Sequence, residues 1–293
     1  MGYISYNRIL NLIKLDMYFK NVVFLSVMLL TLFSCGGSDD GGEEPVVITS
    51  CSGEVVDALP TGNNDVLIWA EEFNEDGSPC SKNWTYDLGT GSWGWGNGES
   101  QYYTRDNAVV ENGVLKIIAK KENYQDSQYT SARIKTQGRF NFTYGRIDVR
   151  AKLPASQGTW PAIWMLGSNF TQVGWPHCGE IDIMEQTGNN KNKSLGTVHW
   201  WSTDHNASYG LTTAVANAST QFHVYSCEWT DKAVKIYVDD VKYFEMTNSS
   251  SLPFYNKDFF IILNVALGGT LGGAIDSNFT EDTMEIDYVR VYQ

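Results

Sequence analysis

Three carboxylates stand close together in the segment from residue 178 to residue 186, which has the sequence Cys-Gly-Glu-Ile-Asp-Ile-Met-Glu-Gln. Apolar residues alternate with acids as in a β-strand, so Glu180 and Asp182 share one face of that strand. Strict alternation puts Glu185 on the opposite, core-facing side, where an ionised carboxylate is costly. One extra residue at Met184, a β-bulge, resets the phase, and we therefore expect all three acids on one face.

Three neighbouring acids repel one another, which raises the pKa of at least one of them. A glycosidase needs this arrangement, because one carboxylate must be ionised to attack while another is protonated to donate. In a retaining enzyme the two carboxyl groups stand about 5–5.5 Å apart. The backbones of Glu180 and Glu185 are roughly 13 Å apart if four strand steps separate them, so the side chains must lean together over a curved strand. A solvent-facing strand of ordinary acids, or a calcium site, is the alternative interpretation.

The elements that must hold these acids are short strands. From about Val46 onward the sequence shows short alternating or apolar runs broken by Gly, Asn, Asp and Ser, without long helical periodicity. Examples are 66–69, 114–119, 145–153, 162–166, 180–184, 196–200, 223–229, 234–238, 259–266 and 284–292. Turn signals at residues 112–113 and 239–240 add to this pattern, which favours one all-β sandwich or jelly roll over residues 51–293.

Several segments together resemble glycoside hydrolase family 16. The segment Gly179–Glu185 is similar to the family's E-x-D-x-x-E motif in its bulged form, and Trp93–Thr104 is similar to its laminarinase-type segment. Residues 144–154, 158–167 and 286–292 match further family segments in the same order, so the resemblance covers nearly all of residues 65–293. It implies a concanavalin-like β-jelly-roll sandwich with a concave substrate cleft, and a retaining double displacement.

The resemblance also implies roles for individual residues. Glu180 is the expected nucleophile, Glu185 the expected acid/base, and Asp182 the residue that orients Glu180. His199 matches a strand position that faces these acids, although a lone histidine is also common in structural roles. The expected sugar contacts are Asn97, Arg133, Trp160, Trp164 and Trp175. For the tryptophans, and for Trp164 above all, burial in the core is the alternative.

A structural calcium ion is a further expectation from the resemblance, and no cofactor is expected for catalysis. Glu72, the carbonyl of Gly113 and Asp287 occupy positions that match calcium ligands of the family, and oxygen ligands suit that ion. The expected ion lies on the convex face of the sandwich, away from the acids.

The charge of the chain limits what it binds. A formal net charge of −13 argues against nucleic acid and anionic lipid, because cations to neutralise phosphate are lacking. A neutral polysaccharide fits, and 10 Trp and 16 Tyr can supply apolar faces for sugar rings. The segment Gly94–Asn97 favours a laminarin-type β-1,3-glucan as substrate. We separately expect a monomeric enzyme that cuts internal bonds. Mixed-linkage β-glucan or a red-algal galactan is the alternative substrate, and a non-catalytic surface glycan-binding protein is the alternative class.

The first 35 residues predict a lipoprotein signal peptide rather than part of the fold. Met17–Lys20 leads into an apolar run from Val22 to Phe33, which ends just before Cys35. Residues 1–16 resemble an upstream extension. The run is too short to span a bilayer as a mature helix, and a retained membrane anchor is the alternative.

Cys35 is then the acylated first residue of the mature protein. Residues 36–50 are rich in Gly and acids in their first part and form a flexible tether. An acidic tether at this place resembles the surface-export signal of Bacteroidetes lipoproteins. We therefore expect an outer-membrane lipoprotein exposed at the cell surface, or otherwise a periplasmic one.

Four further cysteines follow, namely Cys51, Cys80, Cys178 and Cys227. A disulfide is permitted outside the cytoplasm, and Cys51 and Cys80 are the pair nearest in sequence. The spacing matches no zinc motif, and Cys178 can also be a small buried residue.

Overall fold

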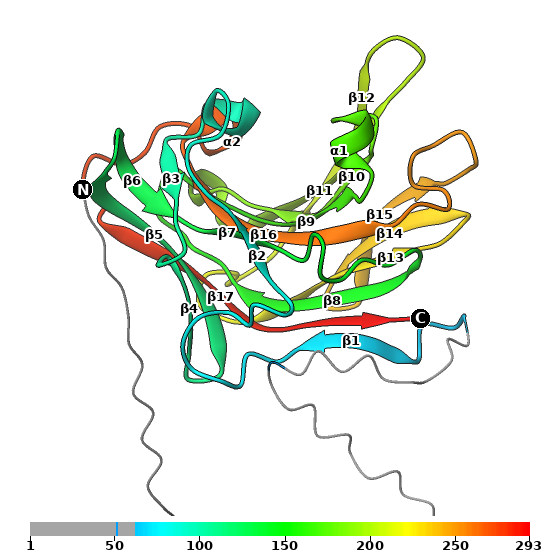
Figure 1. The fold of residues 1–293 in the computed structure, drawn as a ribbon, viewed down its shortest axis with the longest axis horizontal. Coiled ribbons are helices and arrows are strands. Elements are labelled where there is room, and N and C mark those ends of the chain that lie inside the picture. Colours follow the sequence, from blue (N-terminus) through cyan, green and yellow to red (C-terminus); the bar gives the residue numbers. More distant parts are fainter. Residues whose placement is uncertain (1–50, 52–61) are drawn as a thin grey trace, which may run out of the picture. The chain divides into compact units, whose positions relative to one another are not determined.

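The protein folds as two stacked β-sheets (Figure 1), in a computed structural model that describes Cys51 and residues 62–293. These described residues belong to one compact unit. The predicted signal peptide, tether and lipidation site at Cys35 lie outside the described residues, so these stay predictions. Within the described part of the chain, no helix is long and apolar enough to cross a membrane.

One sheet has ten strands. Its main path is β15 (Val241–Thr247), β14 (Ala233–Val238), β13 (His223–Trp229), β8 (Gly145–Lys152), β17 (Glu281–Tyr292), β5 (Val114–Tyr124), β6 (Ser127–Ser131) and β3 (Gln101–Tyr103). At its side, β1 (Leu67–Glu71) pairs with β17, and β4 (Ala108–Glu111) pairs with β5. Most neighbours run antiparallel, whereas β3 and β6 run parallel.

The other sheet has seven strands. Its order is β12 (Asn206–Ala214), β11 (Lys193–Trp201), β10 (Glu180–Glu185), β9 (Thr159–Gly167), β16 (Phe259–Leu267), β7 (Arg133–Lys135) and β2 (Thr85–Asp87). The sheet curves away from its partner, and its hollow face lies between two raised walls (Figure 1). One wall holds α1 (Phe170–Val173) and the β11–β12 hairpin, and the other holds η1 (Gly94–Gly98) and α2 (Gly269–Gly272). A short turn, η2 (Gly188–Asn190), follows β10.

The hydrophobic core lies between the sheets, and the strand patterns follow from that position. β8 buries every second residue, because one of its faces packs on the core while the other meets solvent. β16 is buried at all nine positions. Its Ile261 and Leu263 join the main core, whereas Phe260 and Ile262 form a second apolar cluster that lines a cleft on the hollow face. A continuously buried strand therefore marks the floor of that cleft.

The prediction of an all-β sandwich is confirmed, and each of the runs given above overlaps a strand. Asn112 and Gly113 connect β4 to β5 with φ of 55° and 76°, and Asp239 and Asp240 connect β14 to β15 with φ of 49° and 61°. Positive φ at both central residues is what a two-residue hairpin turn of type I′ requires. Both predicted turns are therefore present.

Candidate active site

β10 carries the predicted β-bulge. Opposite β9, Asp182 pairs with Trp164 and Met184 pairs with Ile163, so two steps on β10 match one step on β9. Opposite β11, the register also shifts between Asp182 and Glu185. One residue of β10 is therefore extra relative to both neighbouring strands.

The bulge decides where the acids point. Ile183 and Met184 are consecutive, yet both are fully buried in the main core. An alternating strand cannot send two successive side chains to one side, whereas a bulged strand can. Glu180, Asp182 and Glu185 all line the same cleft on the other side of the sheet. The predicted placement of the three acids on one face is confirmed.

His199 on β11 and Trp160 on β9 contact the acids from either side. His199 is the cross-strand partner of Glu180. Its Nε2 lies 3.3 Å from Asp182 Oδ2 and 3.9 Å from Glu180 Oε1. Trp160 donates a hydrogen bond from Nε1 to Glu185 Oε1 at 3.0 Å. Each acid thus has a polar neighbour, and the predicted position of His199 beside the acids is confirmed.

The environment disfavours full ionisation of the three acids. Burial raises the pKa of Glu185, and it raises the pKa of Glu180 and of Asp182 well above their ordinary values. Charge on Asp182 adds to the rise in the pKa of Glu180, and charge on Glu185 adds to that of Asp182. His199 opposes the rise in the pKa of Glu180 and Glu185. The trio therefore resists carrying three negative charges, and one ionised acid can stand beside a protonated one.

Glu180, Asp182 and His199 could also ligate a metal ion, since each offers one ligand atom and these atoms lie within 4.8 Å of one another. Such clusters are common without a metal. The third acid, Glu185, is not part of this cluster and instead accepts a hydrogen bond from the indole N–H of Trp160. A second separate carboxylate in the same cleft is needed for glycoside hydrolysis and not for a three-ligand metal site.

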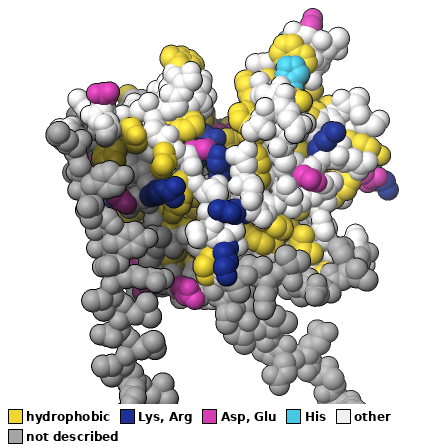
Figure 2. Space-filling view, in the orientation of Figure 1, with side chains coloured by type: hydrophobic (Ala, Val, Ile, Leu, Met, Phe, Trp, Pro, Cys, Tyr) yellow, Lys and Arg dark blue, Asp and Glu magenta, His cyan; other side chains and the backbone are white. Residues whose placement is uncertain are grey.

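The acids lie in a cleft of about 660 Å³. Figure 2 shows the hollow between the two walls, with hydrophobic side chains on both of them. Every sugar-contact residue predicted from the sequence lines this cleft, namely Asn97, Arg133, Trp160, Trp164 and Trp175. Trp164, for which core burial was the alternative, is partly exposed in the cleft, and its Nε1 donates to Asn264 Oδ1 at 2.8 Å.

Arg133 on β7 is held in the cleft by charge and by two aromatic rings. Its Nε lies 3.0 Å from Asp87 Oδ2. Its guanidinium carbon lies 4.9 Å from the centre of the Trp95 ring and 4.7 Å from that of the Trp164 ring. Stacking on aromatic faces and pairing with a carboxylate together fix the planar guanidinium. Arg133 therefore presents fixed N–H donors on the β7 side of the acids.

Asn97 in η1 is fixed by a chain of hydrogen bonds. Its Nδ2 donates to Glu99 Oε1 at 3.1 Å. Glu99 Oε2 also accepts from Gln101 Nε2 at 2.6 Å and from the Tyr103 hydroxyl at 3.0 Å. The Tyr103 hydroxyl in turn accepts from Asn264 Nδ2 at 3.2 Å. This network joins the wall that carries Asn97 to the floor strand β16.

The sequence analysis did not single out several cleft residues, among them Asp87, Trp93, Trp95, Glu99 and Asn264. Two of them carry a signal that could have been used. Asn264 is the one polar side chain in the otherwise apolar run Phe259–Leu267. Trp93 lies in a glycine-rich loop, where a tryptophan has little core to join, and it is 73% exposed.

The three residues predicted to hold calcium come together where β1, β5 and β17 meet. Both carboxylates are already engaged there. Glu72 accepts from Arg290 Nε at 2.7 Å and from Arg290 Nη2 at 2.9 Å, and Asp287 is ion-paired with Arg150. Arg290 therefore competes with a cation for both carboxylate oxygens of Glu72, and Arg150 competes for Oδ2 of Asp287. Calcium at Glu72, Gly113 and Asp287 stays a prediction, and no step below depends on it.

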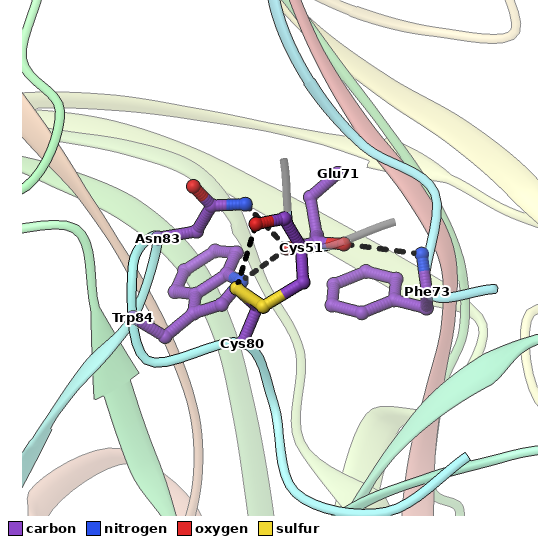
Figure 3. Close-up of a disulfide and its surroundings, with 6 residues drawn as sticks. All are labelled: Cys51, Glu71, Phe73, Cys80, Asn83 and Trp84. Carbon is purple, nitrogen blue, oxygen red and sulfur yellow. Dashed lines mark hydrogen bonds between the residues drawn. A yellow bond between two sulfur atoms is a disulfide. The ribbon is translucent and has the colours of Figure 1, made fainter. Parts of the chain in front are cut away.

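Cys51 and Cys80, the pair nearest in sequence, form a disulfide (Figure 3). Cys178 and Cys227 are buried and free. Cys178 packs with the apolar cluster under the cleft. It is therefore a small buried residue, which was one of the two interpretations of the sequence.

Comparison with known proteins agrees with this geometry. Residues 96–290 match the family model described as glycosyl hydrolases family 16. A β-glucanase from Rhodothermus marinus is 42% identical over 245 residues, which cover 78% of this chain and 85% of that protein.

Two solved structures extend the comparison. A LamA variant from Zobellia galactanivorans, in complex with laminaritriose and laminaritetraose, is 44% identical with a TM-score of 0.74 and covers 78% of this chain and 99% of its own. The laminarinase catalytic domain from Thermotoga maritima is 42% identical with a TM-score of 0.72, and the match covers 78% of this chain and 97% of that one. The bulged acidic strand, the jelly-roll sandwich and the family match agree, and the chain belongs to glycoside hydrolase family 16.

Proposed function

We propose that the protein is a retaining, endo-acting glycoside hydrolase that cleaves β-1,3-glucosidic bonds in laminarin-type glucans. The bulge in β10 carries this proposal, because it brings Glu185 to the face that already holds Glu180 and Asp182. Without it, a single strand would offer one carboxylate pair on the cleft face and bury the third acid. With it, one strand supplies both acids that a glycosidase needs.

Glu180 is the nucleophile in the first step. Its ionised carboxylate attacks the anomeric carbon of the sugar, while Glu185 protonates the glycosidic oxygen of the leaving group. His199, 3.9 Å from Glu180, eases ionisation of the nucleophile. Asp182 lies between the two glutamates and orients Glu180.

Glu185 changes roles in the second step. Having lost its proton, it becomes the base that removes a proton from the attacking water, and the glycosyl–Glu180 ester is hydrolysed. The raised pKa of Glu185 suits a group that must first donate and then accept. Burial raises the pKa of Glu180 as well, so the match to the family motif, and not the order of the two pKa values, assigns the two roles. The Trp160 indole N–H holds its carboxyl in place through both steps.

A neutral glucan suits the cleft around these acids. Aromatic rings from Trp93, Trp95, Trp164 and Trp175 line it, and its cations Arg133 and Lys135 both pair with Asp87. Aromatic faces bind the apolar faces of sugar rings and do not require charge on the ligand. The Zobellia galactanivorans relative was solved with laminaritriose and laminaritetraose, which supports the same substrate class here.

Product analysis on laminarin, lichenan and agarose tests the proposal. We expect early release of a ladder of oligosaccharides from laminarin, with the new anomeric centre formed in the β configuration, as NMR can follow. Glu180→Gln should lose turnover and retain binding. Full activity in Glu180→Gln would exclude its role. Activity confined to agarose or to mixed-linkage glucan would replace the substrate and leave the mechanism in place.

We also propose that the enzyme is an outer-membrane lipoprotein acylated at Cys35. The support is the apolar run that ends just before that cysteine, followed by an acidic and Gly-rich stretch. Metabolic labelling with an alkyne fatty acid should tag the wild type and leave Cys35→Ala untagged. Protease treatment of intact cells then separates surface exposure from a periplasmic location.

A further inference from the structure

Next to Trp175, one wall of the cleft carries further exposed rings to which the proposed function gives no role. Trp175 is 46% exposed and Trp201 is 40% exposed, and His177 is exposed beside them. We call these three residues the aromatic wall. Exposed apolar surface is unfavourable in water, and a cluster of it next to a cleft marks a place where a ligand can cover it.

The aromatic wall begins beside His199, which contacts the catalytic acids. Trp201 follows His199 by two residues on β11, so both side chains lie on the same face of the sheet, about 7 Å apart along the strand. The Trp175 ring centre is 6.2 Å from that of His199. The His177 and Trp201 rings stack with their centres 4.7 Å apart and their planes inclined by 15°.

Trp200, the neighbour of Trp201, shows that a tryptophan on this strand can be packed into the core. Trp200 points to the other face of β11, packs on the main core and contacts Phe254 edge-on. Trp201 instead points to the hollow face, with a histidine ring as its stacking partner. The sequence therefore places one tryptophan in the core and keeps the next one at the cleft.

The position of the wall in the sheet tells which part of a glucan it meets. The strand order is β7, β16, β9, β10, β11, so Arg133 on β7 and Trp201 on β11 lie on opposite sides of the acids on β10. The resemblance of Arg133 and Asn97 to sugar-binding positions of family 16 implies that these two residues contact the non-reducing side of the substrate. A chain whose scissile bond lies over β10 then continues over β11.

Building on the proposed function, we propose that Trp175, His177 and Trp201 bind the glucose residues of the leaving group, on the reducing side of the scissile bond. The stacked His177–Trp201 pair offers a flat face to a sugar ring, and Trp175 joins it to the site of cleavage. Binding there makes the rate depend on sugars beyond the bond that is cut. The wall thus sets a preference for longer chains.

Trp201→Ala, compared on two substrates, tests the wall. Laminarihexaose places sugars on both sides of the bond, whereas 4-nitrophenyl β-laminaribioside has a leaving group without sugar. We expect kcat/KM on laminarihexaose to fall about tenfold, the equivalent of ~1.4 kcal/mol, and kcat/KM on the aryl substrate to stay within about twofold. Trp201→Phe keeps a ring and should recover most of the loss. Tyr124→Ala removes an exposed aromatic on β5, which belongs to the other sheet, and should change neither rate.

Equal losses on both substrates would mean that Trp201 acts through the fold or through His199, and this would overturn the proposal. An unchanged rate on laminarihexaose would overturn it as well. The wild-type rate on laminarihexaose reports the proposed function by itself, whereas the ratio of the two losses reports the wall. Wild-type inactivity on every β-1,3-glucan would overturn both, and a ratio of one would overturn the wall alone.

Discussion

Glu71 and Asp182 are equally buried, since each residue is 4% exposed, yet their surroundings differ. Glu71, beside the disulfide, accepts hydrogen bonds from Asn83 Nδ2 at 2.8 Å, from Trp84 Nε1 at 3.3 Å and from the Phe73 amide at 3.3 Å (Figure 3). These donors satisfy the carboxylate within the fold. Such a group is a structural anchor.

Asp182 has a different set of neighbours. Two other acids share its cleft, and the close polar contact of its Oδ2 is His199 at 3.3 Å. Burial and the charge of Glu185 hold its pKa well above the ordinary value. Burial alone thus does not make a carboxylate reactive. The supply of N–H donors decides whether a buried acid stabilises the fold or remains available to exchange a proton.

The largest expected effect is at the cleft. Glu185→Gln removes the proton donor, so kcat/KM on laminarin should fall by roughly 10²–10⁴-fold. The loss should be smaller on an aryl laminaribioside, because nitrophenolate leaves without being protonated. Thermal unfolding should show no decrease in stability, since the variant removes a charge from a crowded site. A fall in the melting temperature with unchanged activity would mean that Glu185 is a structural anchor, as Glu71 is.

The opposite result is expected at the anchor. Glu71→Gln puts an NH₂ group where N–H donors converge, so we expect the free energy of unfolding to drop by about 1–3 kcal/mol. Activity per folded molecule should stay at the wild-type level. Chemical denaturation and laminarin assays on the same preparation measure both quantities. Glu111→Gln is the matched control, because Glu111 is exposed and its ion pair with Lys116 is screened by solvent, so its loss should change stability little.

The sequence could predict the reactive region better than the anchor, for a physical reason. The bulge was predictable because strict alternation would have buried the charge of Glu185, and one extra residue removes that conflict. The role of Glu71 was not, because Asn83 and Trp84 reach it from a turn 12 and 13 residues away. No periodic pattern records a contact of that kind.

Exposure explains why the strand β12 was missed. β12 (Asn206–Ala214) lies at the edge of its sheet and exposes most of its residues, so it lacks the apolar alternation that marks a strand. The wall that contains Trp201 depends on this hairpin. Likewise, the clamp of Trp95 and Trp164 on Arg133 joins a loop to two strands, and only the fold brings them together.

The smallest expected effect is on the pH dependence of stability. The pKa of Asp182 is raised in the folded protein, so the folded state holds its proton more tightly than the unfolded chain does. Its contribution to stability is therefore complete below the ordinary pKa of 3.8 and is lost as pH rises toward the raised pKa. Asp182→Asn carries no such proton and should lose less stability over the same rise.

Urea unfolding at a series of pH values from about 4 to 7 measures this difference. We expect the gap between wild type and Asp182→Asn to change in favour of the variant as pH rises, because only the wild type must release this proton in the folded state. Asp126→Asn, at an exposed turn, is the control and should leave the gap flat. A gap that moves in favour of the wild type would show that Asp182 is stabilised as a charge. Asp182 would then be a carboxylate that the fold stabilises in its charged form, as Glu71 is, and the proposed difference between the two buried acids would be wrong.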